Sequence, residues 1–154
     1  MPKGFSFIVP TLDDATDWTL INNDAFSWRK SPDQLSIESV KYEFTSSEFS
    51  EEFYLLCNNE KSERVGFLSS YITDEKKGVI STIAVLRKYQ GKGIGKALLR
   101  EVMNRMKIKG IAEVRLTVDT QNPTSAIKLY ESHGFTADKQ IIEYIYPISP
   151  TEEE

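Results

Sequence analysis

A glycine-rich run joins an apolar strand-like segment to a helix-like segment, and it constrains the fold of this chain more than any other feature. The run consists of Gln90, Gly91, Lys92, Gly93, Ile94, Gly95 and Lys96. Residues 79–85 before it are mostly apolar, and the apolar positions after it recur at helical spacing up to Met106. Glycines at alternate positions let the backbone approach a ligand closely, and the N–H groups at a helix start favour phosphate. The run therefore predicts a site for a phosphorylated cofactor.

The spacing of these glycines excludes two common phosphate-binding motifs. A P-loop has four residues between its first glycine and Gly-Lys-Ser/Thr. Here Gly91 and Gly95 enclose three residues, and Ala97 stands where a Mg²⁺-binding hydroxyl would be. The dinucleotide motif Gly-x-Gly-x-x-Gly needs a third glycine at the position that Lys96 occupies. The run is therefore either another kind of cofactor loop or a glycine-rich turn that binds no ligand.

Two separated motifs resemble those of the GNAT family of N-acetyltransferases. The first covers residues 83–99, where Gln-x-x-Gly-x-Gly follows an apolar strand, as in the acyl-CoA pyrophosphate loop of that family. The second begins at residues 118–123 and continues through Ala126, Leu129, Tyr130, Gly134 and Phe135. Two motifs in the right order are more specific than either alone, and together they cover roughly the last 70 residues.

The resemblance implies that acetyl-CoA is the cofactor. The backbone of the strand before the loop would pair with the pantetheine arm and polarise the thioester, and the N–H groups of the loop would hold the pyrophosphate. Asn122 resembles an asparagine that contacts the pantetheine or the acceptor, with a turn or capping asparagine as the alternative. It precedes Tyr130 by eight residues, where seven is the common spacing. The cofactor-binding residues implied in this way are Ile83, Ala84, Val85, Gln90, Gly91, Lys92, Gly93, Ile94, Gly95, Lys96, Asn122 and Tyr130.

Acetyl transfer to an amine needs a polarised carbonyl, a group that takes the amine proton and a group that protonates the leaving thiolate. The resemblance makes Tyr130 the general acid, with a packed helix tyrosine as the alternative. The glutamates of some family members correspond to Val79 and Thr117, which cannot act as bases. Asp119 is the nearest carboxylate by sequence and is the candidate base, with a turn or capping aspartate as the alternative. Further candidates are Glu143, Tyr144 and a water relay.

The charge of the chain is unevenly spread. Residues 1–75 carry 6 basic and 14 acidic side chains, whereas residues 76–109 carry ten Lys or Arg and only one acid, Glu101. A basic region around the glycine run suits a polyanionic cofactor. A nucleic-acid patch would be an alternative, but the net charge of −4 opposes it, so no nucleic-acid partner is expected. The acidic first half could face a cationic acceptor or be an ordinary solvated surface.

With 154 residues, 40% of them hydrophobic, the chain is expected to form one domain over residues 1–149, followed by an acidic tail at 150–154. No apolar run approaches the ~20 residues of a membrane span, so no membrane partner is expected. The one cysteine, Cys57, excludes an internal disulfide, fits a cytoplasmic protein and is expected to be buried and not a nucleophile. His133 lies beside Gly134 at a predicted helix end, where a solvent-facing histidine is expected. No group of residues has metal-ligand spacing, so no metal is expected.

The expected elements alternate between strands and helices. Strands are expected at residues 5–9, 53–57, 64–72, 79–85, 114–118 and 140–146. Helices are expected at residues 11–26, at 31–42 with Pro32 in the first turn, at 94–109 and at 125–133. The order β-α-α-β-β-β-α-β-α-β indicates an α/β fold with a mixed, mostly antiparallel central sheet flanked by helices, which is the order of the GNAT fold. The short stretch after Phe135 predicts a short or single terminal strand instead of the two-strand hairpin usual in the family.

The expected function is acetyl-CoA-dependent transfer of an acetyl group to a primary amine by direct attack in a ternary complex. The acceptor could be a small molecule or a protein amine, and the protein a monomer or a homodimer. Trp18, Phe26 and Trp28 are candidates for the acceptor cleft, although ordinary core is the favoured role. The alternative function is an acyl-CoA-binding module without turnover, and a second rival is an RNA- or nucleotide-binding domain that uses the basic region.

Overall fold

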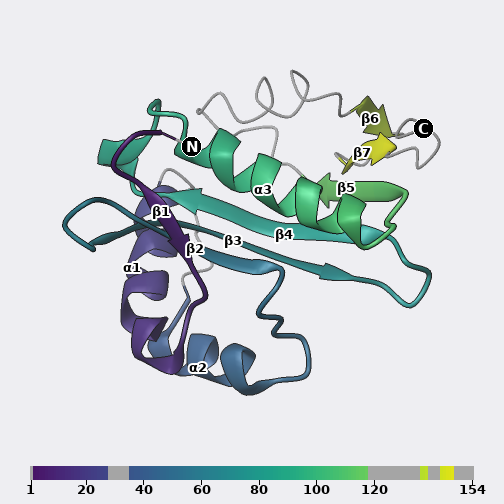
Figure 1. The fold of residues 1–154 in the computed structure, drawn as a ribbon. Helices are drawn as coiled ribbons and strands as arrows, with labels where there is room; N and C mark the ends of the chain where they lie inside the picture. Colours follow the sequence, from purple (N-terminus) through teal and green to yellow (C-terminus); the bar gives the residue numbers. More distant parts are fainter. Residues whose placement is uncertain (1, 28–34, 118–135, 139–142, 148–154) are drawn as a thin grey trace.

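A single sheet of seven strands forms the centre of the part of the chain that the structure describes (Figure 1). In the computed structural model this part comprises residues 2–27, 35–117, 136–138 and 143–147. The strands are β1 (Ser6–Ile8), β2 (Tyr54–Asn58), β3 (Arg64–Ile72), β4 (Gly78–Val85), β5 (Glu113–Thr117), β6 (Thr136–Asp138) and β7 (Glu143–Pro147). Their spatial order is β1-β2-β3-β4-β5-β7-β6, and neighbours are antiparallel except for the parallel pair β4 and β5. The predicted mixed, mostly antiparallel sheet is confirmed.

Helices cover both faces of this sheet (Figure 1). Helices α1 (Ala15–Ala25) and α2 (Ile37–Thr45) lie on one face, and α3 (Ile94–Ile108) lies on the other. Two short 3-10 helices, η1 (Leu12–Asp14) and η2 (Arg87–Tyr89), precede α1 and the glycine run. Among the helices that the structure describes, none combines the length and the apolar character needed to cross a bilayer.

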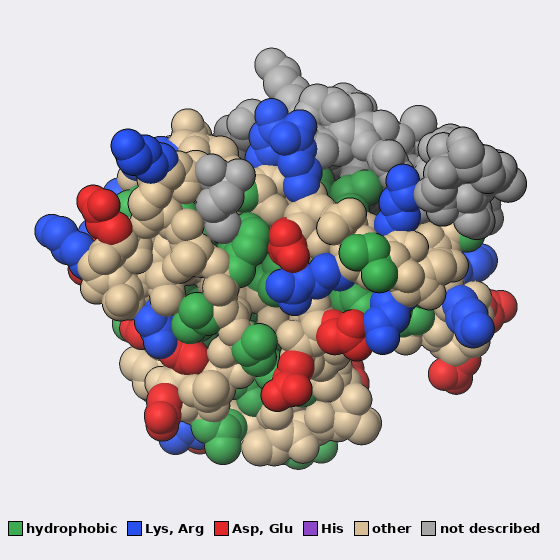
Figure 2. Space-filling model, viewed as in Figure 1, with side chains coloured by type: hydrophobic (Ala, Val, Ile, Leu, Met, Phe, Trp, Pro, Cys, Tyr) green, Lys and Arg blue, Asp and Glu red, His purple; other side chains and the backbone are tan. Residues whose placement is uncertain are grey.

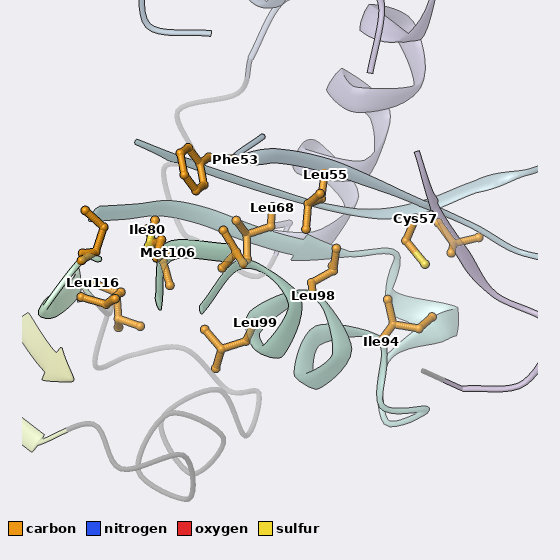
Figure 3. Packing of buried hydrophobic residues seen from close by; sticks show 14 residues of the cluster. Phe53, Leu55, Cys57, Leu68, Ile80, Ile94, Leu98, Leu99, Met106 and Leu116 are labelled. Carbon is orange, nitrogen blue, oxygen red and sulfur yellow. The ribbon is translucent and has the colours of Figure 1, made fainter. Parts of the chain in front are cut away.

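The face of the sheet under α3 holds one hydrophobic cluster. The apolar stripe predicted for this helix is its buried side, and each of its members is at most 1% exposed. The stripe consists of Ile94, Leu98, Leu99, Val102 and Met106. It packs against strand residues that include Leu55, Leu68 and Ile80 (Figure 3). Because burial of one such side chain stabilises a fold by about 1.5–3 kcal/mol, this packing holds the start of α3 in a defined place at the end of β4.

The opposite face holds an aromatic cluster under α1 and α2. The Trp18 ring of α1 stacks on Phe67 of β3 with centroids 3.8 Å apart, and Phe44 of α2 meets Trp18 edge-on at 5.0 Å. Trp18 is 1% exposed and belongs to this core, as the favoured role for it requires, and it also lines the cleft described below. Phe26 is partly buried against the same cluster, and Trp28 lies outside the described residues.

Helix α2 begins later than the sequence predicts. Its first residue is Ile37, whereas the prediction placed its start at Ser31 and Pro32. The cap explains the difference, because the Ser39 backbone N–H donates to the Ser36 hydroxyl over 3.1 Å and the Ser36 backbone N–H donates to the Ser39 hydroxyl over 3.2 Å. A reciprocal pair of this kind satisfies N–H groups that a helix start leaves free.

Two strands are described after residue 135, so a single terminal strand is wrong, whereas the alternative of a short strand fits the three residues of β6. Strands β6 and β7 pair in an antiparallel manner from Thr136 opposite Ile145 to Asp138 opposite Glu143. A three-residue strand suffices because β7 is also paired with β5 along its other edge, from Glu113 opposite Pro147 to Thr117 opposite Glu143. The helix expected at residues 125–133 lies outside the described residues.

Cys57 is fully buried in β2, on the α3 side of the sheet (Figure 3), as the sequence predicts. Burial raises the pKa of its thiol from an ordinary value of 9.0 to about 11. The fold therefore favours the neutral thiol, which argues against a nucleophilic role because the thiolate is the reactive form.

The stability of the protein should accordingly fall at alkaline pH. The stabilisation that the neutral Cys57 thiol gives the fold is fully present below pH 9 and is lost as the pH rises from about 9 to about 11. In that range the thiol ionises readily only in the unfolded chain. We expect Cys57→Ala to lose less unfolding free energy than the wild type across this range, by at most about 2.7 kcal/mol. Urea unfolding at about pH 7.5 and about pH 10.5 measures the difference. Equal losses in the two proteins would contradict the expectation.

Candidate active site

Strands β4 and β5 separate partway along β4. Strand β5 pairs only with the first three residues of β4, where Gly78, Val79 and Ile80 face residues 114–116. Residues 81–85 lie beside β3 on the other side, but within the described chain they have no strand partner on the β5 side. An unpaired strand edge presents N–H and C=O groups, and an extended molecule can pair with such an edge.

A β-bulge lies where this free edge begins. Ser69 of β3 faces Thr82, but the next residue, Ser70, faces Ile80, so Ser81 is the extra residue on β4. A bulge bends its strand and redirects side chains. As a result, two successive hydroxyl residues, Ser81 and Thr82, both line the cleft on the α1 and α2 side of the sheet.

The glycine run follows β4 and η2 and turns the chain into α3. Gly91 and Gly93 have φ angles of +80° and +86°, values in the left-handed region that glycine adopts without strain. Gly93 is the N-terminal cap of α3, and within the described chain no side chain caps this helix. The first N–H groups of α3 therefore remain available for an anion, and the side chains of Lys92 and Lys96 are exposed beside them. Figure 2 shows further lysine and arginine side chains on the α3 side of the molecule.

Three hydrogen bonds brace the turn that leads into this loop. The Arg87 backbone N–H donates to Asp24 Oδ2 over 2.7 Å, which ties the turn to α1. The Asn59 side-chain amide donates to the Tyr89 hydroxyl over 3.0 Å. Gln90 donates from Nε2 to the carbonyl of Val85 over 3.0 Å. Gln90, which the resemblance assigns to the cofactor, thus links the loop to the last residue of β4.

The side chains of the strand before the loop belong to the core. Ile83 and Val85 pack against the cluster under α3, and Ala84 is buried in the aromatic cluster on the other face. Ile94 is also buried. The cofactor contacts implied for these residues would therefore come from their backbone groups, as the resemblance requires for the strand.

A cleft of about 380 Å³ opens on the α1 and α2 side of the sheet. Its floor includes one row of cross-strand partners, in which Tyr54 of β2 faces Ser69 of β3 and Ser69 faces Thr82 of β4. The cleft is lined by Trp18, Asn22, Leu35, Tyr42, Glu43, Ser46, Glu48, Tyr54, Phe67, Ser69, Tyr71, Ser81 and Thr82. It therefore reaches from α2 to the bulge of β4, where the free strand edge begins.

One carboxylate of the cleft has a fixed partner. The Tyr54 hydroxyl donates to Glu43 Oε2 over 2.6 Å. Burial raises the pKa of Tyr54 well above its usual value, and the hydrogen bond to Glu43 and the nearby charges of Glu43 and Glu48 raise it further. Tyr54 is consequently a proton donor to Glu43 throughout the physiological range.

Sequence reasoning missed this pair. Glu43 precedes the buried Phe44 on a short amphipathic helix, and eleven positions separate it from Tyr54. Helical periodicity assigns Val40 and Phe44 to the core, but it does not predict which strand residue an adjacent polar side chain will meet. The acidic excess of residues 1–75 was the only signal, and it does not single out Glu43.

Several predicted site residues lie outside the described part of the chain. They are Asp119, Asn122, Tyr130 and His133. Glu143 and Tyr144, the alternative bases, lie on β7, where Glu143 is opposite Thr117 and Tyr144 is opposite Leu116. Within the described ranges, no three His, Cys, Asp or Glu side chains come together as a possible metal site.

Residues 16–135 match the model of the Acetyltransferase (GNAT) family. Mycothiol acetyltransferase from Renibacterium salmoninarum is 29% identical over 144 residues, which are 90% of this chain and 42% of that protein. The corresponding enzyme from Paenarthrobacter aurescens is 31% identical over 144 residues, or 88% of this chain and 43% of that protein. The chain thus spans less than half the length of these relatives.

Solved structures share the fold. A GCN5-related N-acetyltransferase from Sphaerobacter thermophilus is 26% identical, with a TM-score of 0.75 over 97% of this chain and 46% of that one. The PaiA N-acetyltransferase of Thermoplasma acidophilum, solved in complex with coenzyme A, is 22% identical, with a TM-score of 0.73 over 93% and 98% of the two chains. The ribosomal-protein-S18-alanine N-acetyltransferase of Escherichia coli has a TM-score of 0.75 at 20% identity, over 94% of each chain.

Proposed function

Because this chain belongs to the GNAT acetyltransferase family, whose acyl donor is acetyl-CoA, we propose that it transfers an acetyl group from acetyl-CoA to a primary amine. The observation that carries the proposal is the edge of β4 that has no strand partner within the described residues and that runs from the bulge at Ser81 to the glycine turn. The strand edge offers hydrogen-bonding groups to an amide-containing arm. The helix start that follows it along the chain offers N–H groups to a pyrophosphate.

Bound acetyl-CoA would supply the acetyl group as an activated thioester. The backbone of residues 83–85 would hold the pantetheine arm, and the N–H groups from Gly91 to Lys96 would bind the pyrophosphate. The exposed Lys92 and Lys96 would offset its charge. A Cβ added at Gly91 would meet no other part of the described chain within 4 Å, and this open space fits the close approach of a ligand.

The amine would approach from the other side of β4, through the cleft. Ser81 and Thr82 line this cleft at the point where the free edge begins, so an amine there would meet the thioester. The amine must lose a proton and the leaving thiolate must gain one. We assign the second step to Tyr130, as the family resemblance implies, and the first to Asp119, the nearest carboxylate by sequence, or to a water relay.

An assay of thiol release with a panel of amines tests the proposal. The panel needs both small amines and peptides, because the names of the relatives refer to molecules as different as mycothiol and a ribosomal-protein alanine. We expect thiol release that depends on both acetyl-CoA and an amine. Tight binding of acetyl-CoA by calorimetry without thiol release for any amine would favour the acyl-CoA-binding module instead.

A further inference from the structure

The cleft has two chemically different ends. The row Tyr54–Ser69–Thr82 crosses three neighbouring strands, so its ends are about 10 Å apart, twice the spacing of about 4.8 Å between strands. The reacting nitrogen belongs at the β4 end, beside Thr82, if the thioester lies along the free edge. Glu43 is held at the other end by the Tyr54 hydroxyl. A ligand that contacts both ends of this row must therefore span about two strand spacings.

The end of the cleft at Glu43 is suited to a cation. Glu43 and Glu48 both line it, and none of the lining residues in the described ranges is a lysine or arginine. Neither carboxylate forms an ion pair within the described chain. Tyr42 and Tyr71, which are 77% and 41% exposed, add aromatic rings to the wall, and such rings attract cations.

A buried hydroxyl lies between the two ends. Ser69 is 4% exposed and lines the cleft, yet its hydroxyl forms no hydrogen bond within the part of the chain that the structure describes. Buried polar groups are nearly always hydrogen-bonded. A polar molecule that extends along the row from Tyr54 to Thr82 would supply the missing partner.

We propose that the acceptor carries a second cationic group, which Glu43 binds while the reacting amine lies at the β4 bulge. The inference rests on the proposed function and extends it, because it gives the acceptor class as a primary amine with a second positive charge several bonds away. Small diamines and peptides that combine a free amine with a neighbouring cationic side chain share this chemistry. The volume of the cleft, about 380 Å³, suits a ligand of modest size.

Matched amines test the proposal in the wild-type protein. We expect α,ω-diamines to show a higher kcat/KM than monoamines of the same carbon number, with an optimum chain length that reflects the span of the cleft. Peptides with a free α-amine, with and without a neighbouring lysine, distinguish a peptide acceptor from a small diamine. Equal kcat/KM for diamines and monoamines at every length, and for both kinds of peptide, would overturn the proposal without any substitution.

The variant Glu43→Gln should then lose selectivity. Because a hydrogen bond to a charged group is stronger than a neutral one, we expect kcat/KM for the preferred diamine to fall roughly 10- to 100-fold. The kcat/KM for the matched monoamine should change by less than about twofold. Glu38→Gln is the control, since Glu38 is an exposed carboxylate on the same helix that does not line the cleft. An equal loss for both amines would show that Glu43 acts on the reacting nitrogen and would overturn the inference.

Two further measurements separate this inference from the proposed function. Calorimetry with the diamine and the monoamine measures the preference for two charges without any turnover, so it remains informative if no thiol is released. The variant Tyr54→Phe keeps the carboxylate but removes its hydrogen-bond donor, and we expect it to reduce the diamine preference less than Glu43→Gln does. A wild type that binds both amines equally would contradict the inference even if acetyl transfer is observed.

Discussion

Replacing Gly91 by valine is expected to weaken acetyl-CoA binding at least tenfold, or about 1.4 kcal/mol. Gly91 has a φ of +80°, and a side chain in this left-handed region costs about 1–2 kcal/mol. The chain can relieve the strain only by rotating the backbone, which would turn the neighbouring N–H groups away from the pyrophosphate. Calorimetric titration with acetyl-CoA measures the change.

Gly110 provides a matched control at the other end of α3. Its φ of +82° is nearly that of Gly91, and at both glycines an added Cβ would meet no other part of the described chain within 4 Å. Gly110→Val should therefore lower the unfolding free energy by a similar amount and leave the affinity for acetyl-CoA unchanged. If the two variants bind acetyl-CoA equally well, the glycine turn is not the phosphate site.

Replacing Tyr130 by phenylalanine is expected to lower turnover by about 10²- to 10⁴-fold, the usual contribution of a general acid. The substitution removes only the hydroxyl, because a phenyl ring keeps the shape of the side chain but cannot donate a proton to the leaving thiolate. Single-turnover kinetics with an excess of enzyme measures the chemical step, and calorimetry should show unchanged affinity for acetyl-CoA.

The control for this substitution is Tyr146→Phe on β7, which makes the same chemical change on a strand that pairs with β5 at Val114. We expect it to retain wild-type turnover. Unchanged turnover in Tyr130→Phe would remove Tyr130 from the mechanism. A lower affinity for acetyl-CoA together with an unchanged rate of the chemical step would make Tyr130 a binding residue instead.

Local signals predicted most of the described fold. Strand β3 occupies residues 64–72 as expected, and the buried stripe of α3 follows the helical spacing of its apolar residues. These predictions succeed because strand and helix periods are written in consecutive residues. The predicted start of α2 was wrong because the cap that Ser36 and Ser39 form begins the helix at Ile37. The second terminal strand, β6, was not located because it depends on β7 for its pairing, and β7 lies against β5.

The bulge and the separation of β4 from β5 illustrate what periodicity does not predict. Nothing in residues 78–85 marks Ser81 as the extra residue, because a bulge is defined by the partner strand. Likewise, the length over which β5 pairs with β4 depends on how the two strands are placed by the helices around them. The resemblance implied a free edge at residues 83–85, and among the described residues the unpaired edge of β4 begins at Ser81.

The sequence by itself predicted the donor and the loop proposed to bind it. The glycine run, the strand before it and the helix after it are contiguous, so their spacing alone predicts a cofactor loop, and the family match over residues 16–135 agrees with it. Only the tertiary structure revealed the cleft that we propose for the acceptor. Glu43 and Tyr54 meet across α2 and β2, and the row from Tyr54 to Thr82 spans three strands. Contacts of this kind depend on packing between distant segments, which no local pattern of residues encodes.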